Sequence, residues 1–128
     1  MEREIFIMQI GSFSVNFGAS IPNTSAAKEL QSLFELSKNC DYVLKPTKYS
    51  DLCKKINRIF PAKTDEVIFN QCDNKFGNGN GYTVSGSVIH NNRQKSFSTR
   101  VYPLGGSIIM GNDIIKAIEN TLNNKRST

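Results

Sequence analysis

The sequence predicts an α+β fold, with helices packed on one face of a mainly antiparallel sheet. Apolar residues recur with a helical period in residues 26–39, 51–60 and 113–124, and they alternate with polar residues between residues 65 and 102. Glycine, asparagine and proline separate these segments. Because 128 residues without a linker or repeat is an ordinary length for one domain, we expect a single α+β domain over residues 1–128.

The chain begins with two short segments that predict a β-hairpin. Residues 3–10 form a dense apolar run, and residues 12–17 alternate strictly between apolar and polar side chains. Gly11 between them suits a tight turn. The apolar run is too short and too broken for a signal peptide or a membrane span, so we expect a cytoplasmic protein with no membrane partner.

Two helices are predicted next. Residues 22–25 supply capping side chains, and the helical period over residues 26–39 predicts the first helix. Ser50 is expected to cap a shorter helix over residues 51–60, which Pro61 ends.

From residue 65 the pattern changes to that of antiparallel strands. If Asn92 and Arg93 are the central residues of a turn, Val88 faces Phe97 and the apolar side chains of this hairpin share one face. The expected strands are residues 65–72, 81–90 and 95–102, with an optional fourth at residues 107–110 after the Gly105–Gly106 turn.

The opposite face of that hairpin carries almost only hydroxyl side chains. Its residues are Thr83, Ser85, Ser87, Ser96, Ser98, Arg100 and Tyr102. An edge strand with such a surface is open to pairing with a strand of another chain. A final helix over residues 113–124, capped by Asn112, completes the order ββααββ(β)βα.

The glycine-rich segment NKFGNGNGYT, residues 74–83, does not predict a phosphate-binding loop. Such loops open a helix with the spacing G-x-G-x-x-G or end in Gly-Lys-Ser/Thr, whereas the residues after Gly81 form a strand pattern. Repeated Asn-Gly pairs instead favour a hairpin loop. Phe76 in this loop is a candidate anchor for a partner.

A catalytic set is not evident, because the chain has a single histidine and scattered acidic residues. An enzyme is therefore the minority interpretation. A one-histidine nuclease is kept as an alternative. It would use His90, an arginine on the phosphate, and Glu66 or Asp73 as the base. Arg93, Lys95 and Arg100 lie on the same predicted hairpin as His90.

The three cysteines, Cys40, Cys53 and Cys72, include no CxxC pair, so we interpret them as small buried apolar residues. Neither a metal nor a cofactor is expected.

The charge distribution is the most informative feature. Residues 45–63 contain six cationic side chains and one acidic residue, Asp51, so the net charge of this segment equals the net charge of +5 of the whole chain. A basic patch attracts acidic protein surfaces or nucleic acid. No RNA-binding motif is present, although Tyr42 and Tyr49 flank the basic helix predicted over residues 51–60 and are available for stacking.

These observations favour a small protein-binding protein that occludes an acidic protein partner, as toxin-immunity proteins and anti-defence inhibitors do. The expected contact residues are Lys48, Lys54, Lys55, Arg58, Phe76, Ser98, Arg100 and Tyr102. An RNA-binding or RNA-cleaving module is the first alternative, and a structural subunit of a homo-oligomer is the second.

Overall fold

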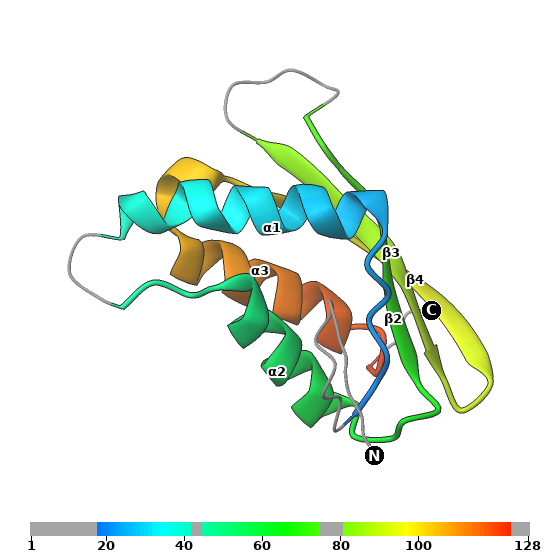
Figure 1. Ribbon diagram of the computed structural model, residues 1–128. Coiled ribbons are helices and arrows are strands. Elements are labelled where there is room, and N and C mark those ends of the chain that lie inside the picture. Colours follow the sequence, from blue (N-terminus) through cyan, green and yellow to red (C-terminus); the bar gives the residue numbers. More distant parts are fainter. Residues whose placement is uncertain (1–17, 42–44, 75–80, 124–128) are drawn as a thin grey trace, which may run out of the picture.

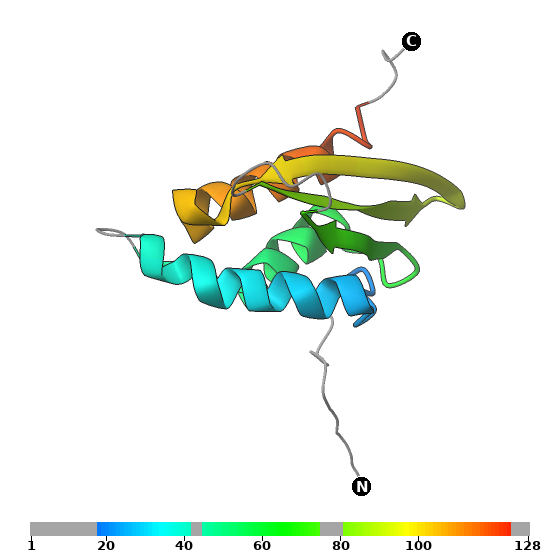
Figure 2. The ribbon, with the colours of Figure 1, turned by 90° about the horizontal axis from the view of Figure 1, so that it is seen from above.

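The computed structural model describes residues 18–41, 45–74 and 81–123. It has the predicted α+β architecture, with the helices on one side of a three-stranded antiparallel sheet (Figures 1 and 2). The elements are α1 (Ser25–Ser37), η2 (Lys38–Cys40), α2 (Tyr49–Ile59), β2 (Glu66–Asp73), β3 (Tyr82–His90), β4 (Arg93–Val101), η3 (Pro103–Gly105) and α3 (Ser107–Glu119). The hairpin expected over residues 3–17 lies outside the described residues.

Helix α1 begins at a residue that also holds it against the sheet. The Thr24 hydroxyl accepts a hydrogen bond from the Ala27 N–H at 3.0 Å and donates one to the Phe69 carbonyl of β2 at 2.6 Å. One side chain therefore caps the helix and anchors it to the outer edge of β2.

Helix α2 begins two residues earlier than predicted, at Tyr49 rather than residue 51. The Asp51 carboxylate reaches back and accepts a hydrogen bond from the Lys48 N–H at 2.9 Å. Since this contact fixes the first turn, Ser50 lies inside the helix and the predicted cap at Ser50 is wrong.

The strands lie in the order β2-β3-β4, and the predicted register of the last hairpin is wrong by two residues. The turn residues are Asn91 and Asn92, both with positive φ, so His90 pairs with Arg93. Two residues with positive φ form the type I′ turn that matches strand twist, which asparagine tolerates and arginine does not. A shift of two residues leaves every side chain on its predicted face.

Helix α3 corrects two further predictions, because residues 107–110 are helical and Asn112 lies inside the helix. Gly106, at φ +105°, provides no side-chain cap. Instead the Asp41 carboxylate accepts hydrogen bonds from the Ser107 N–H at 3.0 Å and from the Ser107 hydroxyl at 2.5 Å. A residue far away in the sequence thus sets the start of this helix.

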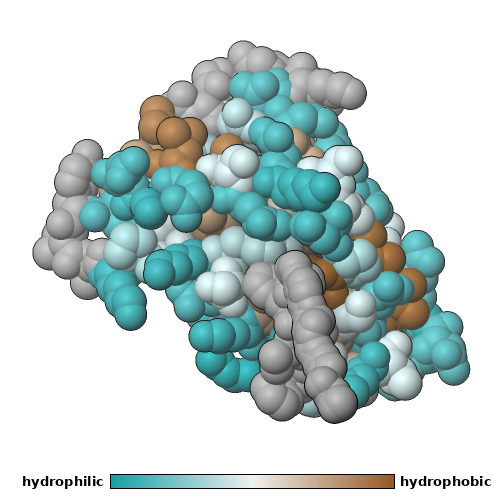
Figure 3. Space-filling model, in the orientation of Figure 1, coloured by the Kyte–Doolittle hydropathy of each residue, from teal (hydrophilic) through white to brown (hydrophobic). Residues whose placement is uncertain are grey.

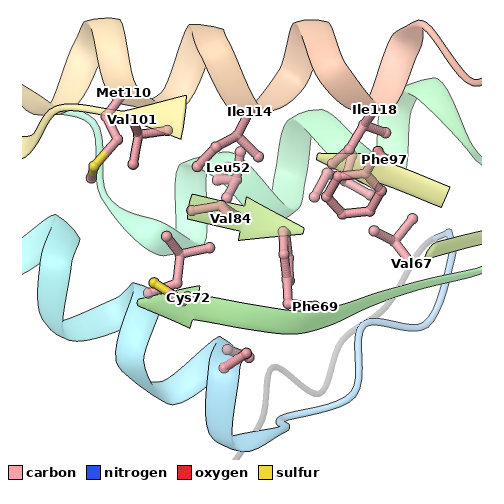
Figure 4. Packing of buried hydrophobic residues seen from close by; sticks show 14 of the residues in the cluster. Leu52, Val67, Phe69, Cys72, Val84, Phe97, Val101, Met110, Ile114 and Ile118 are labelled. Carbon is pink, nitrogen blue, oxygen red and sulfur yellow. The ribbon is translucent and has the colours of Figure 1, made fainter. Parts of the chain in front are cut away.

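The core lies between the sheet and the helices (Figure 4). Phe69 and Phe97 meet edge to face, with ring centroids 5.7 Å apart. Gly86 lies beside them, where an added Cβ would stand 1.9 Å from the Ile68 carbonyl oxygen. The labelled residues of this core are Leu52, Val67, Phe69, Cys72, Val84, Phe97, Val101, Met110, Ile114 and Ile118.

Candidate functional site

The basic segment of the sequence forms a surface on and around α2. Its members are Lys45, Lys48, Lys54, Lys55, Arg58 and Lys63, which we call the basic surface. Leu52, Cys53 and Ile56 occupy the buried side of the helix, so the cationic residues are left on the outward side. Hydrophilic side chains dominate the view over α1 and α2 in Figure 3.

The cationic groups of this surface are not neutralised within the described ranges. The ion pairs found there join Lys38 to Glu35 and His90 to Asp65, and none involves the basic surface. The single acid in the segment, Asp51, accepts a backbone hydrogen bond. Lys54 and Arg58, one helical turn apart and both exposed, therefore present adjacent charges to the solvent.

The face of the sheet turned away from the helices carries the predicted hydroxyl groups. Ser98 is exposed on β4, Arg100 is partly exposed, and Tyr102 follows the strand and is half exposed. Ile89 on β3 shares this face by alternation, so the surface is less purely hydroxyl than expected. The candidate anchor Phe76 lies outside the described residues.

The single histidine has a carboxylate partner that the sequence did not indicate. His90 Nδ1 lies 2.7 Å from Asp65 Oδ2, and the ring contacts Phe60 edge to face. Asp65 is buried, and it precedes β2 while His90 ends β3. Only the pairing of these two strands brings the residues together, which no local pattern shows.

Two of the residues expected for the nuclease alternative, Glu66 and Arg100, do not lie with the His90 imidazole. Glu66 pairs with Ile89 next to His90, but its side chain points to the opposite face of the sheet from the imidazole. Arg100 pairs with Thr83 at the far end of β3. At about 3.3 Å per residue, it lies roughly 23 Å from His90 along the sheet.

Arg93 and Lys95 do lie near the histidine. They line one open hollow with His90, and Lys95 Nζ donates to the Thr121 carbonyl at 3.2 Å.

Two of the three thiols are held in the protonated form by their surroundings. Burial raises the pKa of Cys72 to about 12, with the charges of Glu29 and Asp73 adding to the shift. Burial also raises the pKa of Cys53, to about 11, although a hydrogen bond from Tyr49 opposes it. These two cysteines are buried as predicted, whereas Cys40 is only partly buried.

Three apolar side chains that sequence reasoning overlooked are exposed at one corner of the molecule. Leu36, Leu104 and Ile109 are 57%, 59% and 57% exposed, and they belong to the end of α1, to η3 and to the first turn of α3. The Ser37 hydroxyl donates to the Pro103 carbonyl at 2.6 Å and joins two of these elements. Figure 3 shows a hydrophobic group at this corner.

Comparisons with protein-family models, curated proteins and solved structures found no match to this chain. Within residues 18–41, 45–74 and 81–123, no three His, Cys, Asp or Glu side chains gather where they could hold a metal ion. The helices found in the same ranges are too short or too polar to cross a membrane.

Proposed function

We propose that this chain is a protein-binding protein that occludes an acidic surface of a partner protein. The observation that carries the proposal is the basic surface around α2, whose cationic groups have no ion-pair partner within the described ranges. Unpaired surface cations attract an acidic protein over a Debye length and orient it as it approaches.

Electrostatic attraction alone does not make a stable complex, so the surface needs apolar contacts as well. The exposed Leu36, Leu104 and Ile109 offer such contacts at the corner where α1, η3 and α3 meet. A protein interface usually combines apolar anchors with charged groups.

RNA binding is the second candidate function, and the same basic surface favours it. Phosphate contacts need only cations, and Lys54 and Arg58 lie one turn apart on an exposed helix face. RNA cleavage is less well supported, because Arg100 lies at the opposite end of the sheet from His90 and Glu66 points to the opposite face.

The test is affinity capture from a cell lysate at moderate salt, with a nuclease-treated sample in parallel. The proposal predicts one stoichiometric acidic protein that survives nuclease treatment. The double variant Lys54→Gln/Arg58→Gln should capture less of it than the wild type, while Lys28→Gln/Lys38→Gln, which removes equal charge from α1 and η2, should capture as much. Material that disappears with nuclease would replace the proposal with RNA binding.

A further inference from the structure

The two edges of the sheet differ in how their backbone groups are satisfied. On the β2 edge, the Val67 N–H donates to the Ser20 carbonyl at 2.9 Å, and the Phe69 carbonyl accepts from the Thr24 hydroxyl at 2.6 Å. Ser20 also forms a parallel bridge with Glu66. The start of the chain's described part therefore closes this edge.

Among the described residues nothing covers the β4 edge in this way, and the register of the hairpin shows which of its backbone groups point outward. A two-residue type I′ turn makes its flanking pair, His90 and Arg93, a hydrogen-bonded pair, and bonded pairs then recur at every second residue. The residues of β4 between the bonded pairs turn their N–H and C=O groups away from β3. They are Gln94, Ser96, Ser98 and Arg100.

No hydrogen bond reaches those outward backbone groups from any described residue. Gln94, Ser96 and Ser98 are also exposed. By the same alternation, the backbone groups of Val67 and Phe69 on β2 also point away from the sheet, but these groups have hydrogen-bond partners. The two edges therefore differ in whether their outward groups are bonded, and not in whether such groups exist. An unprotected strand edge of this kind is a template for another strand.

A groove follows this edge. It lies between residues 95–99 of β4 and the second half of α3, and it has a volume of about 350 Å³. Asp113, Lys116 and Ala117 are among the helix residues that line it. A strand beside a helix-lined groove is the arrangement in which extended peptides add to a sheet, with side chains entering the groove.

We infer that the β4 edge takes up an extended, acidic segment of the partner protein as a fourth strand of the sheet. This inference rests on the proposed binding of a partner protein and names how one part of that partner is held. The outward groups from Gln94 to Arg100 span roughly 20 Å at about 3.3 Å per residue, which matches a segment of about seven residues.

Charge determines the choice of occupant. β4 carries Arg93, Lys95 and Arg100 and no acidic residue, and Lys116 adds a fourth cation from α3 against Asp113. Pairing with a second copy of the chain would bring two such edges, and two molecules of net charge +5, together. A segment with aspartate or glutamate on alternate positions would instead meet opposite charges.

The test uses a displayed library of random twelve-residue peptides, followed by synthetic versions of the enriched sequences. We expect enriched peptides with acidic residues that bind the wild type. Ser98→Pro should weaken them at least tenfold, because proline removes an outward N–H that no strand of this chain uses. Ser98→Ala retains that N–H and should weaken binding less than Ser98→Pro does.

Substitution on the peptide side avoids any effect on folding. Alternate amides of a bound peptide face β4, and the amides between them face away. N-methylation of the set that faces β4 should weaken binding at least tenfold, and N-methylation of the other set should leave binding unchanged. The inference would be overturned if no peptide is enriched, or if methylation of the two sets of amides weakens binding equally. If light scattering detects a dimer of the wild type that Ser98→Pro converts to a monomer, the occupant of the edge is a second copy of the chain.

The two proposals can fail separately in these experiments. The variant Lys54→Gln/Arg58→Gln alters the basic surface but not the β4 edge, so it should still bind the peptides. If Ser98→Pro retains the acidic partner in the capture experiment, strand addition is wrong while the proposed function stands. If peptides bind the edge but no acidic protein is captured, the proposed function fails.

Discussion

Removal of the Asp41 carboxylate should destabilise the protein through the N-terminal end of α3. This carboxylate accepts from the Ser107 N–H and hydroxyl at 3.0 and 2.5 Å and from the Ile108 N–H at 3.4 Å. The Ser107 hydroxyl in turn accepts from the Thr47 N–H at 2.8 Å. Because Gly106 supplies no cap of its own, Asp41→Ala leaves these helix donors without their acceptor.

The magnitude follows from two contributions. Loss of an N-terminal cap costs about 1 kcal/mol, and loss of a negative charge at this end of the helix costs about 0.3–1 kcal/mol. Asp41→Ala should therefore lower the free energy of unfolding by about 1.3–2 kcal/mol and Tm by roughly 4–8 °C. Asp41→Asn retains an acceptor oxygen but loses the charge, so it should cost about half as much.

Urea unfolding followed by circular dichroism at pH 7 measures the effect, with an unchanged m-value as the check that the same transition is compared. Glu119→Ala is the matched control. It removes an exposed acid from the other end of α3, where a negative charge is unfavourable, and should leave stability unchanged or slightly higher.

The effect of Asp41 should also depend on pH. Partial burial raises the pKa of its carboxyl, but hydrogen bonds from Ser107 and Ile108 lower it more, so the pKa lies below its ordinary value of 3.8. The charge therefore stabilises the fold above the unfolded pKa, and this stabilisation is lost as the pH falls through the folded pKa. The difference in the free energy of unfolding between wild type and Asp41→Asn should become smaller as the pH falls from 6 towards 3. An Asp41→Ala variant within about 0.5 kcal/mol of wild type at pH 7 would refute the reasoning.

Three further results are expected. Gly86→Ala should lower the free energy of unfolding in urea by about 1–3 kcal/mol, because its Cβ would stand 1.9 Å from a strand carbonyl. Gly105→Ala is the control, because its Cβ would meet nothing within 4 Å, and it should change the free energy of unfolding by less than about 0.5 kcal/mol. Thr24→Ala should cost about 1–2 kcal/mol, since both the cap of α1 and its bond to β2 are lost, and Thr24→Ser should restore most of it. Cys53 and Cys72, with pKa values raised to about 11 and 12, should resist iodoacetamide at pH 8 until the protein is unfolded, as mass spectrometry would show.

Hydrophobic periodicity was enough to predict most of the fold. It located α1, α2 and the three strands, because each buries a regular stripe of apolar side chains against the same core. The start of α3 could not be predicted, since residues 107–110 resemble a strand and the cap comes from Asp41, 66 residues away. The β3–β4 turn was predictable in principle, because Asn91 and Asn92 both tolerate positive φ.

The candidate sites divide in the same way. The basic surface was predicted because its cationic residues are close in sequence and lie around one helix. The pairing of His90 with Asp65 and the open edge at Ser98 depend on which strands are neighbours and on the hydrogen-bond phase of the hairpin. The hydroxyl-rich hairpin already suggested an open edge, but which strand forms that edge, which of its backbone groups point outward and the contact of His90 with Asp65 needed the structure.

The salt dependence of the captured complex tests the central claim most directly. Binding of an acidic protein with an apolar contact predicts an affinity that falls by less than about tenfold between 50 and 200 mM salt, because surface charge there mainly sets the association rate. A fall of about a thousandfold or more over the same range would mean that the basic surface around α2 neutralises phosphates, and would contradict the proposed function.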